Sequence, residues 1–298
     1  MCGIAGLFIK DPKLQPQLGE LLAKMTSTLC SRGPDSAGFA IYGSADAGRS
    51  KLTIAGPSEA AIANVAAKLV DAIDPAASFA VRLSHAVVVL RDEDINRAIA
   101  WLEANFPEVS IVSEGHRLEI YKEVGYPDDV ASAFKIASMS GTHGISHTRM
   151  ATESAVTTDG AHPFSTGADQ CLVHNGSLSN HASLRRELTR EGVRIKTDND
   201  SEVAAGYLTH RMRQGQTLGE ALKSGLNDLD GFFTFVVGTE SGFGVLRDPI
   251  ACKPAVMAET DRYVAFASEY KSLTCLPDIK HARVWEPKPA TVYFWEHA

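Results

Sequence analysis

The chain enters a buried strand almost at its first residue, because the apolar run Gly3–Ile9 directly follows Met1 and Cys2. A short apolar run that ends at a charged turn predicts a strand in the interior. Cys2 therefore stands at the start of that strand, and its small side chain allows aminopeptidases to remove Met1. Removal would leave a thiol and a free α-amine on one residue. An α-amine with a pKa of about 7.7 to 8.0 can act as base for a thiol with a pKa near about 8.5, although a second-position cysteine without a role is the simpler interpretation.

The composition limits the classes of function. Of the 298 residues, 44% are hydrophobic, and 29 Lys and Arg against 36 Asp and Glu give a net charge of -7. This balance argues against nucleic acid or a membrane surface as the main partner and favours small molecules or proteins. The five scattered cysteines form no CxxC pair, which argues against a disulfide framework and favours a reducing, cytoplasmic location. Without an export signal, a run of about 20 apolar residues, a GxGxxG motif or a cysteine cluster, we expect a soluble protein that binds no metal or cofactor.

The order of predicted elements favours an α+β chain with an insertion. We expect a helix within residues 18–29 and a strand at 38–42 that pairs with the first strand. Residues 51–134 then form a small α+β insertion, with helices at 58–73 and 92–105 and strands near 79–90, 109–112 and 118–124. After the insertion we expect strands at 144–148, 170–174, 231–238, 242–247, 255–258, 263–268 and 291–294, and helices at 180–191, 202–213 and 218–226. The final third is therefore mainly antiparallel sheet.

Three polar segments are candidates for chemistry. Asn175 and Gly176 place a side-chain amide next to a glycine N–H, as an oxyanion hole requires, although Asn-Gly is also the commonest hairpin turn. Arg149, just past a predicted strand, offers a guanidinium fork for a substrate carboxylate, with a surface ion pair as the alternative. Asp200 and Glu202 begin a helix, where an acid either caps the helix or binds a substrate ammonium.

Together, these separated motifs resemble the class II glutamine amidotransferase family, whose members are N-terminal-nucleophile hydrolases. The motifs, in the order of that family, are Met1-Cys2-Gly3-Ile4-Ala5-Gly6, Arg32-Gly33-Pro34-Asp35-Ser36-Ala37-Gly38, His147-Thr148-Arg149, His162-Pro163-Phe164, His174-Asn175-Gly176 and Asp200-Ser201-Glu202. Later blocks, Arg247-Asp248-Pro249, Lys253-Pro254 and Phe266-Ala267-Ser268-Glu269, look like those of the asparagine synthetase and amidophosphoribosyltransferase branches. Each motif alone is weak, whereas the ordered set is specific.

The resemblance implies a fold and a nucleophile. The fold is a four-layer αββα sandwich over residues 1–298, interrupted by the insertion at about 51–134. Cys2 would attack the carboxamide of L-glutamine, while Asn175 and Gly176 stabilise the oxyanion. Ammonia would leave first, and water would then release glutamate from a γ-glutamyl thioester on Cys2.

The resemblance also implies the residues that surround the substrate. Arg149 would bind the α-carboxylate and Asp200 the α-ammonium of glutamine. Arg32 and His162 lie at family positions that shape the site, and Thr152 is a weaker candidate.

The opening segment resembles free-standing amidotransferase subunits of glutamate-synthase-like systems, above all that of N-methylglutamate synthase. In those systems the flavin and iron–sulfur chemistry lies on other polypeptides, so a separate synthase subunit would consume the ammonia. Two alternatives stay open: a stand-alone hydrolase of γ-glutamyl amides, and an inactive assembly scaffold. Met150 and Glu153 depart from residues common in the family, and the insertion is longer than in most relatives. The insertion is a candidate docking surface.

Overall fold

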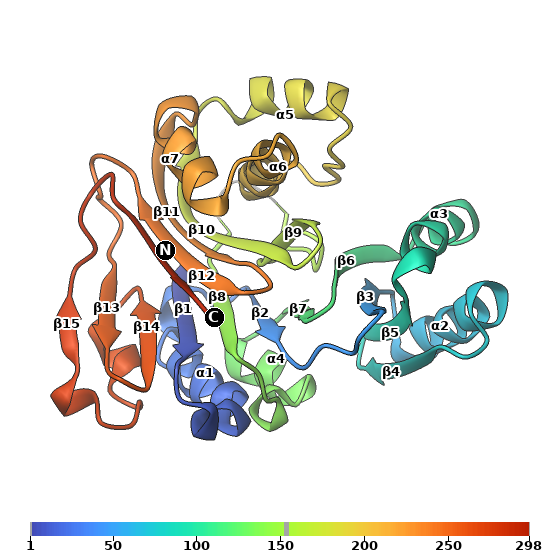
Figure 1. Ribbon diagram of the computed structural model, residues 1–298, viewed down its shortest axis with the longest axis horizontal. Coiled ribbons are helices and arrows are strands. Elements are labelled where there is room, and N and C mark those ends of the chain that lie inside the picture. Colours follow the sequence, from blue (N-terminus) through green and yellow to red (C-terminus); the bar gives the residue numbers. More distant parts are fainter. Residues whose placement is uncertain (1, 152–154, 298) are drawn as a thin grey trace.

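Two antiparallel sheets lie face to face in the computed structural model, which describes residues 2–151 and 155–297 (Figure 1). The larger sheet contains, in spatial order, β15 (Arg283–Trp285), β13 (Val256–Glu259), β14 (Tyr263–Ala267), β1 (Gly3–Ile9), β8 (His143–Arg149), β2 (Ser36–Tyr42) and β7 (Leu118–Val124). The smaller sheet contains β16 (Val292–Glu296), β12 (Gly242–Arg247), β11 (Gly231–Gly238), β10 (Gln170–Leu178) and β9 (Phe164–Gly167). The sequence did not indicate β9 and β15, which have only four and three residues.

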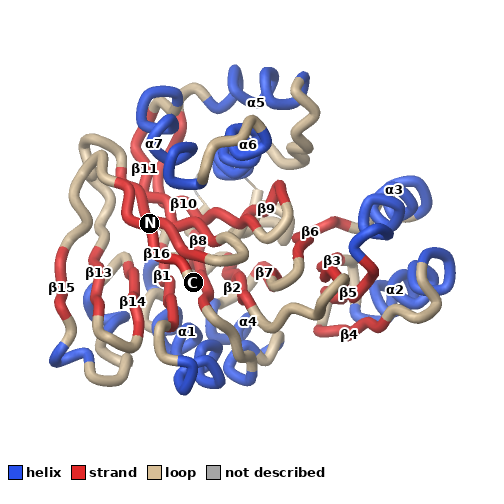
Figure 2. The backbone as a smooth tube through the Cα atoms, viewed as in Figure 1, coloured by secondary structure: helices blue, strands red, loops and turns tan. Residues whose placement is uncertain are grey.

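Helices cover the outer face of each sheet, which gives the four-layer αββα order expected from the sequence (Figure 2). The helices on the larger sheet are α1 (Leu18–Ser27) and α4 (Pro127–Ala133). Those on the smaller sheet are α5 (His181–Arg190), α6 (Asp200–Arg213) and α7 (Leu218–Asp228). None of the helices in the described part of the chain is long and apolar enough to cross a membrane.

Alternate side chains along β1 pack into two different layers of the sandwich. Leu7 packs in the cluster between the larger sheet and its helices, together with Leu22 of α1. Ile4 and Phe8 point the other way and pack between the sheets with Phe243 of β12. Because successive side chains alternate across a strand, a strand covered on both faces must be apolar throughout, as GIAGLFI is.

The strand order corrects one expectation from the sequence. The strand at 38–42 was expected to pair with β1, but β8 lies between them and pairs with both, Gly3 with Thr148 on one side and Gly38 with His147 on the other. A helix connects β1 to β2, so no tight turn forces those two strands together. All three strands are buried along their whole length, and hydrophobicity alone therefore could not order them.

The insertion builds a separate lobe, which we define as residues 49–115 and call the insertion lobe. Its sheet has the order β4 (Ser78–Arg82), β5 (His85–Arg91), β3 (Arg49–Ala55) and β6 (Ser110–Gly115), and it packs on α2 (Glu59–Ile73) and α3 (Ile95–Asn105). The single strand expected near 79–90 is a hairpin, because Leu83 turns the chain with a φ of 51°. The expected range 51–134 also covers β7 and α4, which belong to the sandwich.

Candidate active site

Cys2 lies where the two sheets meet, directly before β1. Its carbonyl oxygen accepts hydrogen bonds from Arg32 Nε at 3.0 Å and from Asn175 Nδ2 at 3.2 Å. Arg32 precedes β2 of the larger sheet, and Asn175 belongs to β10 of the smaller one. Both layers therefore fix the backbone of Cys2, while the residue itself is only partly buried.

The guanidinium of Arg32 has a second partner beside the site. Its Nη1 donates to Glu269 Oε1 at 2.6 Å, and the Arg32 side chain is 10% exposed. The hydrogen bond from Arg32, followed by that from Lys271, lowers the pKa of the Glu269 carboxyl. Arg32 therefore connects the backbone of Cys2 with Glu269, which lies just after β14.

Asn175 and Gly176 lie inside β10 rather than in a hairpin turn, which excludes the turn interpretation of this motif. Asn175 pairs with Thr234 and Gly176 with Phe233 of β11. Gly176 has a φ of +157°, and a Cβ at this position would stand 1.8 Å from the carbonyl oxygen of Phe232. Only glycine fits there. The amide of Asn175 is buried and reaches Cys2 across the gap between the sheets.

Arg149 is the last residue of β8 and is 5% exposed. It follows Thr148, the partner of Gly3 in the sheet, so its backbone lies beside that of Cys2. Its Nη1 donates to the carbonyl oxygen of Ala155 at 3.4 Å. The guanidinium is therefore buried in the interior, rather than forming an exposed ion pair. Thr152, the weaker candidate, lies outside the described residues.

Asp200 begins α6 and bonds back to β10. Its Oδ2 accepts the backbone N–H of Leu178 at 2.8 Å, and its Oδ1 accepts from Ser201 Oγ at 3.2 Å. The capping role is taken by Asn199, whose side chain accepts from the Ser201 N–H at 2.9 Å. The Asp200 side chain remains 22% exposed. It thus offers a carboxylate close to the Asn175–Gly176 segment without being needed as a helix cap.

Three buried histidines, His147, His162 and His174, contact one another near Asn175. His162 stacks on His147 with ring centroids 3.9 Å apart, and His147 Nε2 lies 3.0 Å from the carbonyl oxygen of His174. Burial lowers the pKa of His147 to about 3 and that of His162 well below its usual range, so both rings are neutral. Within residues 2–151 and 155–297, neither ring nitrogen of His162 has a hydrogen-bond partner.

Sequence reasoning missed Lys122, which lies in the middle of β7 and is 6% exposed. Its Nζ donates to backbone carbonyls of the segment that carries His162. The available signal was a lysine on the same face of the strand as the apolar residues Leu118, Ile120 and Val124. A buried ammonium needs a set of hydrogen-bond acceptors.

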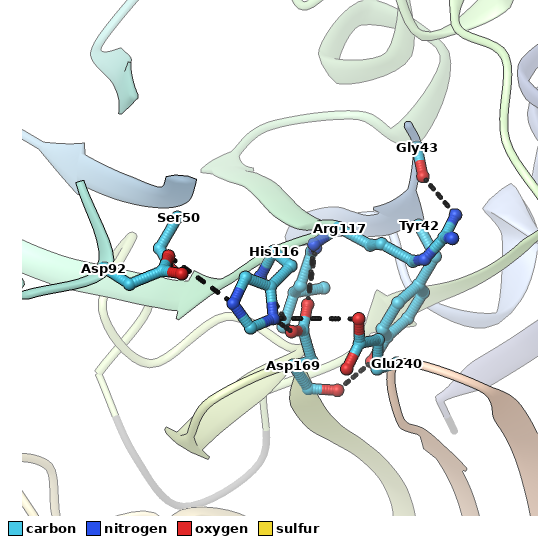
Figure 3. A network of polar contacts seen from close by, with 9 residues as sticks. Tyr42, Gly43, Ser50, Asp92, His116, Arg117, Asp169 and Glu240 are labelled. Atoms are coloured by element: carbon cyan, nitrogen blue, oxygen red, sulfur yellow. Dashed lines mark hydrogen bonds and ion pairs between the residues drawn. The ribbon is translucent and has the colours of Figure 1, made fainter. Parts of the chain in front are cut away.

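A second polar cluster lies at the joint between the sandwich and the insertion lobe (Figure 3). Atoms of His116, Asp169 and Glu240 that could bind a metal lie within 4.8 Å of one another. The Asp169 carboxylate, however, already accepts the N–H groups of His116, Arg117 and Leu118 at 2.7 to 2.9 Å. This cluster is explained by the turn that it holds, because Asp169 closes the connection from β6 to β7.

Comparison with known proteins agrees with this fold. The glutamine amidotransferase domain family matches residues 147–275. The chain is 63% identical to the glutamine amidotransferase-like protein GlxB of Rhizobium meliloti, over 100% of this chain and 99% of that protein. It is 34% identical to a putative glutamine amidotransferase of Methanothermobacter thermautotrophicus, over 98% of this chain and 99% of that protein.

Among solved structures, the glutamine phosphoribosylpyrophosphate amidotransferase from B. subtilis, complexed with ADP and GMP, is similar to this chain with a TM-score of 0.63. The likeness covers 99% of this chain and 47% of that chain, at 18% identity. The chain belongs to the class II glutamine amidotransferases. Its fold is that of the N-terminal-nucleophile hydrolases.

Proposed function

We propose that this protein hydrolyses L-glutamine to glutamate and ammonia, with Cys2 as the nucleophile after removal of Met1. The observation that carries the proposal is the hydrogen bond from Asn175 Nδ2 to the carbonyl oxygen of Cys2 at 3.2 Å. It puts an amide donor next to the thiol-bearing residue. A side-chain amide has two N–H groups, so one can hold the Cys2 backbone while the other faces a developing oxyanion.

In the proposed reaction, the α-amine of Cys2 takes the thiol proton, and Sγ attacks the carboxamide carbon of glutamine. The tetrahedral oxyanion is stabilised by Asn175 and by the N–H of Gly176. The C–N bond then breaks, the proton passes to the leaving ammonia, and a thioester remains. Water, deprotonated by the same amine, attacks the thioester, which releases glutamate and restores the thiol.

The substrate groups match the charges around the nucleophile. Arg149, buried at the end of β8, binds the α-carboxylate with its guanidinium fork. Asp200, partly exposed beside Leu178, binds the α-ammonium. Arg32 holds the nucleophile's backbone, and His162 forms part of the wall.

We further propose that a separate synthase subunit uses the ammonia, in a glutamate-synthase-like system of the N-methylglutamate synthase type. In support, GlxB is matched over 99% of its own length, so that relative is itself little more than this amidotransferase unit. Glutaminase turnover should be weak for the chain alone and rise when the synthase subunits are added. Fast turnover of a larger γ-glutamyl amide without any partner would instead establish the stand-alone hydrolase.

The nucleophile is tested by labelling. Mass spectrometry of the purified protein should show Met1 missing, and a diazo-ketone analogue of glutamine should add once, at Cys2. Cys2→Ala should abolish both labelling and glutaminase activity. Cys252 is the matched control, because it is the exposed cysteine of the described set, and Cys252→Ala should retain both. Retained Met1, or labelling at Cys252, contradicts the proposal.

A further inference from the structure

We infer that Lys122 is a positioning residue of the glutamine site, because its ammonium holds the segment 155–163 against the two groups proposed to bind the substrate. This inference rests on the proposed function. Lys122 itself does not touch the reacting atoms, and its effect passes through the segment. The segment is described from Ala155 onward.

The ammonium of Lys122 is bound to this one segment. Nζ donates to the carbonyl oxygens of Ala161 at 2.8 Å, Asp159 at 3.0 Å and Pro163 at 3.4 Å. It also lies 4.7 Å from the ring centroid of Phe164, a favourable place for a cation. An ammonium has three N–H groups and the three carbonyls take all of them. Its hydrogen bonds to described residues go to backbone carbonyls, while the charges of Asp159 and Glu202 favour the ammonium form and that of Arg149 opposes it.

The segment contacts the group proposed to bind the carboxylate. Arg149 Nη1 donates to the carbonyl oxygen of Ala155 at 3.4 Å, and a Cβ placed on Gly160 would lie 3.2 Å from the same nitrogen. Gly38, the sheet partner of Lys122, leaves room for the carbonyl oxygen of His162, which would stand 2.0 Å from a Cβ there. The contacts with Lys122 and with Gly38 therefore hold the segment next to the guanidinium of Arg149.

The segment also contacts the element proposed to bind the ammonium. Asn199 Nδ2 donates to the carbonyl oxygen of Gly160 at 3.4 Å, and Asn199 caps the helix that begins at Asp200. A shift of residues 159–161 would therefore reach Arg149 on one side and the start of α6 on the other. The contacts of Lys122 fix that part of the segment, and their loss should weaken substrate binding more than the chemical step.

The protonation state of Lys122 gives a test that a purely structural lysine would not pass. Burial lowers its pKa from the usual 10.5 to about 8. A neutral amine has two N–H groups, so deprotonation costs one of the three hydrogen bonds to the segment. Between about pH 8 and 10.5, Lys122 is protonated in the unfolded chain but neutral in the folded protein. The contribution of Lys122 to the free energy of unfolding therefore becomes more favourable to the folded state as the pH rises through this range. Substrate affinity and global stability should thus respond in opposite directions.

The experiment compares Lys122→Met with Lys51→Met. Lys51 is the matched control, since its side chain is 11% exposed and pairs with Glu119 Oε1 of the same strand β7 at 2.7 Å, away from the segment. For Lys122→Met we expect KM for glutamine to rise about tenfold or more, the usual effect of losing a hydrogen bond to a charged group, with little change in kcat. The inhibition constant of the diazo-ketone should rise equally, and Lys51→Met should change neither constant.

A pH series compares the unaltered protein with the variant, because the α-amine of Cys2 titrates in the same range in both, at about 7.7 to 8.0. If Lys122→Met does not fold, Lys122→Arg takes its place, because its guanidinium stays charged throughout the series. KM for glutamine should rise as the pH passes about 8, without a parallel fall in melting temperature, and Lys122→Met should lack that step. An unchanged KM in the variant, an equal loss of kcat, or a wild-type KM that stays flat around pH 8 overturns the positioning role. If the wild-type protein does not react with the diazo-ketone at Cys2, the proposed function itself fails.

Discussion

The sandwich and the insertion lobe differ in what their buried polar groups do. In the insertion lobe, the buried carboxylate of Asp94 is paired with Arg91 and Arg97, whose side chains reach the surface. In the sandwich, the cations of Arg149 and Lys122 are themselves buried, and both donate to the segment 155–163. Burying a charge costs free energy unless partners replace the lost water, so such a cluster is typical of a site rather than of a core. The difference favours the sandwich over the insertion lobe as the location of the proposed site.

The two regions are nevertheless joined by polar contacts close to the site. Ser84, in the β4–β5 turn of the insertion lobe, donates to Glu123 Oε2 at 2.7 Å, and the other oxygen of Glu123 accepts from Thr158. Glu123 follows Lys122 on β7, so adjacent residues of one strand hold the same segment beside Arg149. The lobe has an apolar cluster of its own, yet three of its buried side chains pack in the clusters of the sandwich, namely Ala55, Val87 and Val112.

The largest expected effect separates the two cores. Leu69 in α2 and Leu208 in α6 are both buried, at 0% and 1% exposure. Replacing either by alanine should lower the free energy of unfolding by about 2 to 5 kcal/mol, because each leaves a cavity. Leu69→Ala should leave KM for glutamine unchanged, whereas Leu208→Ala should raise it, since α6 carries Asp200. Denaturant unfolding and steady-state kinetics measure both. Equal effects of the two variants on KM would contradict the prediction that glutamine binding depends on the sandwich and not on the insertion lobe.

The next effect tests the chemistry of the sandwich. Asn175→Ala should lower kcat for glutamine by about 100 to 1000-fold, because one oxyanion donor is lost. Asn180→Ala is the control: Asn180 also donates to a backbone carbonyl, that of Asp228 at 2.8 Å, but at the start of α5. It should change kcat by less than about threefold, in line with the small effects of substitutions away from a site. A loss below about tenfold for Asn175→Ala would argue against its role as an oxyanion donor.

The smallest effect, counted for one histidine and one pH unit, concerns acid. Burial lowers the pKa of His85, His143 and His147 to about 3, so these rings are neutral in the folded protein. In the unfolded chain they bind protons below about pH 6.5, and each therefore costs up to about 1.4 kcal/mol of stability per pH unit between about pH 6.5 and 3. The β4–β5 hairpin of the lobe contributes His85, whereas His143, His147 and His162 belong to the sandwich.

Hydrogen exchange at pH 7 and pH 5 can locate this loss. Strands β1 and β8 should lose more protection on acidification than strands β3 and β5, after correction for intrinsic exchange rates. His143→Gln should reduce the pH dependence of protection in β1 and β8 by about one proton, and His85→Gln should do the same in β3 and β5. A slope that neither variant alters would show that these histidines are not neutral and buried.

Local patterns in the sequence predicted the elements with strong periodicity. The apolar run Gly3–Ile9 is β1 with the same bounds, and the helix expected at 58–73 is α2 with Ser58 as its cap. The ordered motifs also pointed to the family before any fold was known. These predictions succeeded because the burial of a single segment and the capping of its ends depend on residues that are close together in the sequence.

Only the tertiary structure decided how distant segments meet. The place of β8 between β1 and β2, the position of Asn175 within a strand, and the contacts of Lys122 all depend on residues far apart in the chain. Asn175 is 173 residues from Cys2, and Glu269 is 237 residues from Arg32. Hydrophobic periodicity says that a segment is buried, but not which of several equally apolar strands lies beside it. The sequence by itself therefore determined most helices and strands of this protein and the candidate nucleophile Cys2. The packing of segments that are distant in the chain determined which charged side chains lie around Cys2.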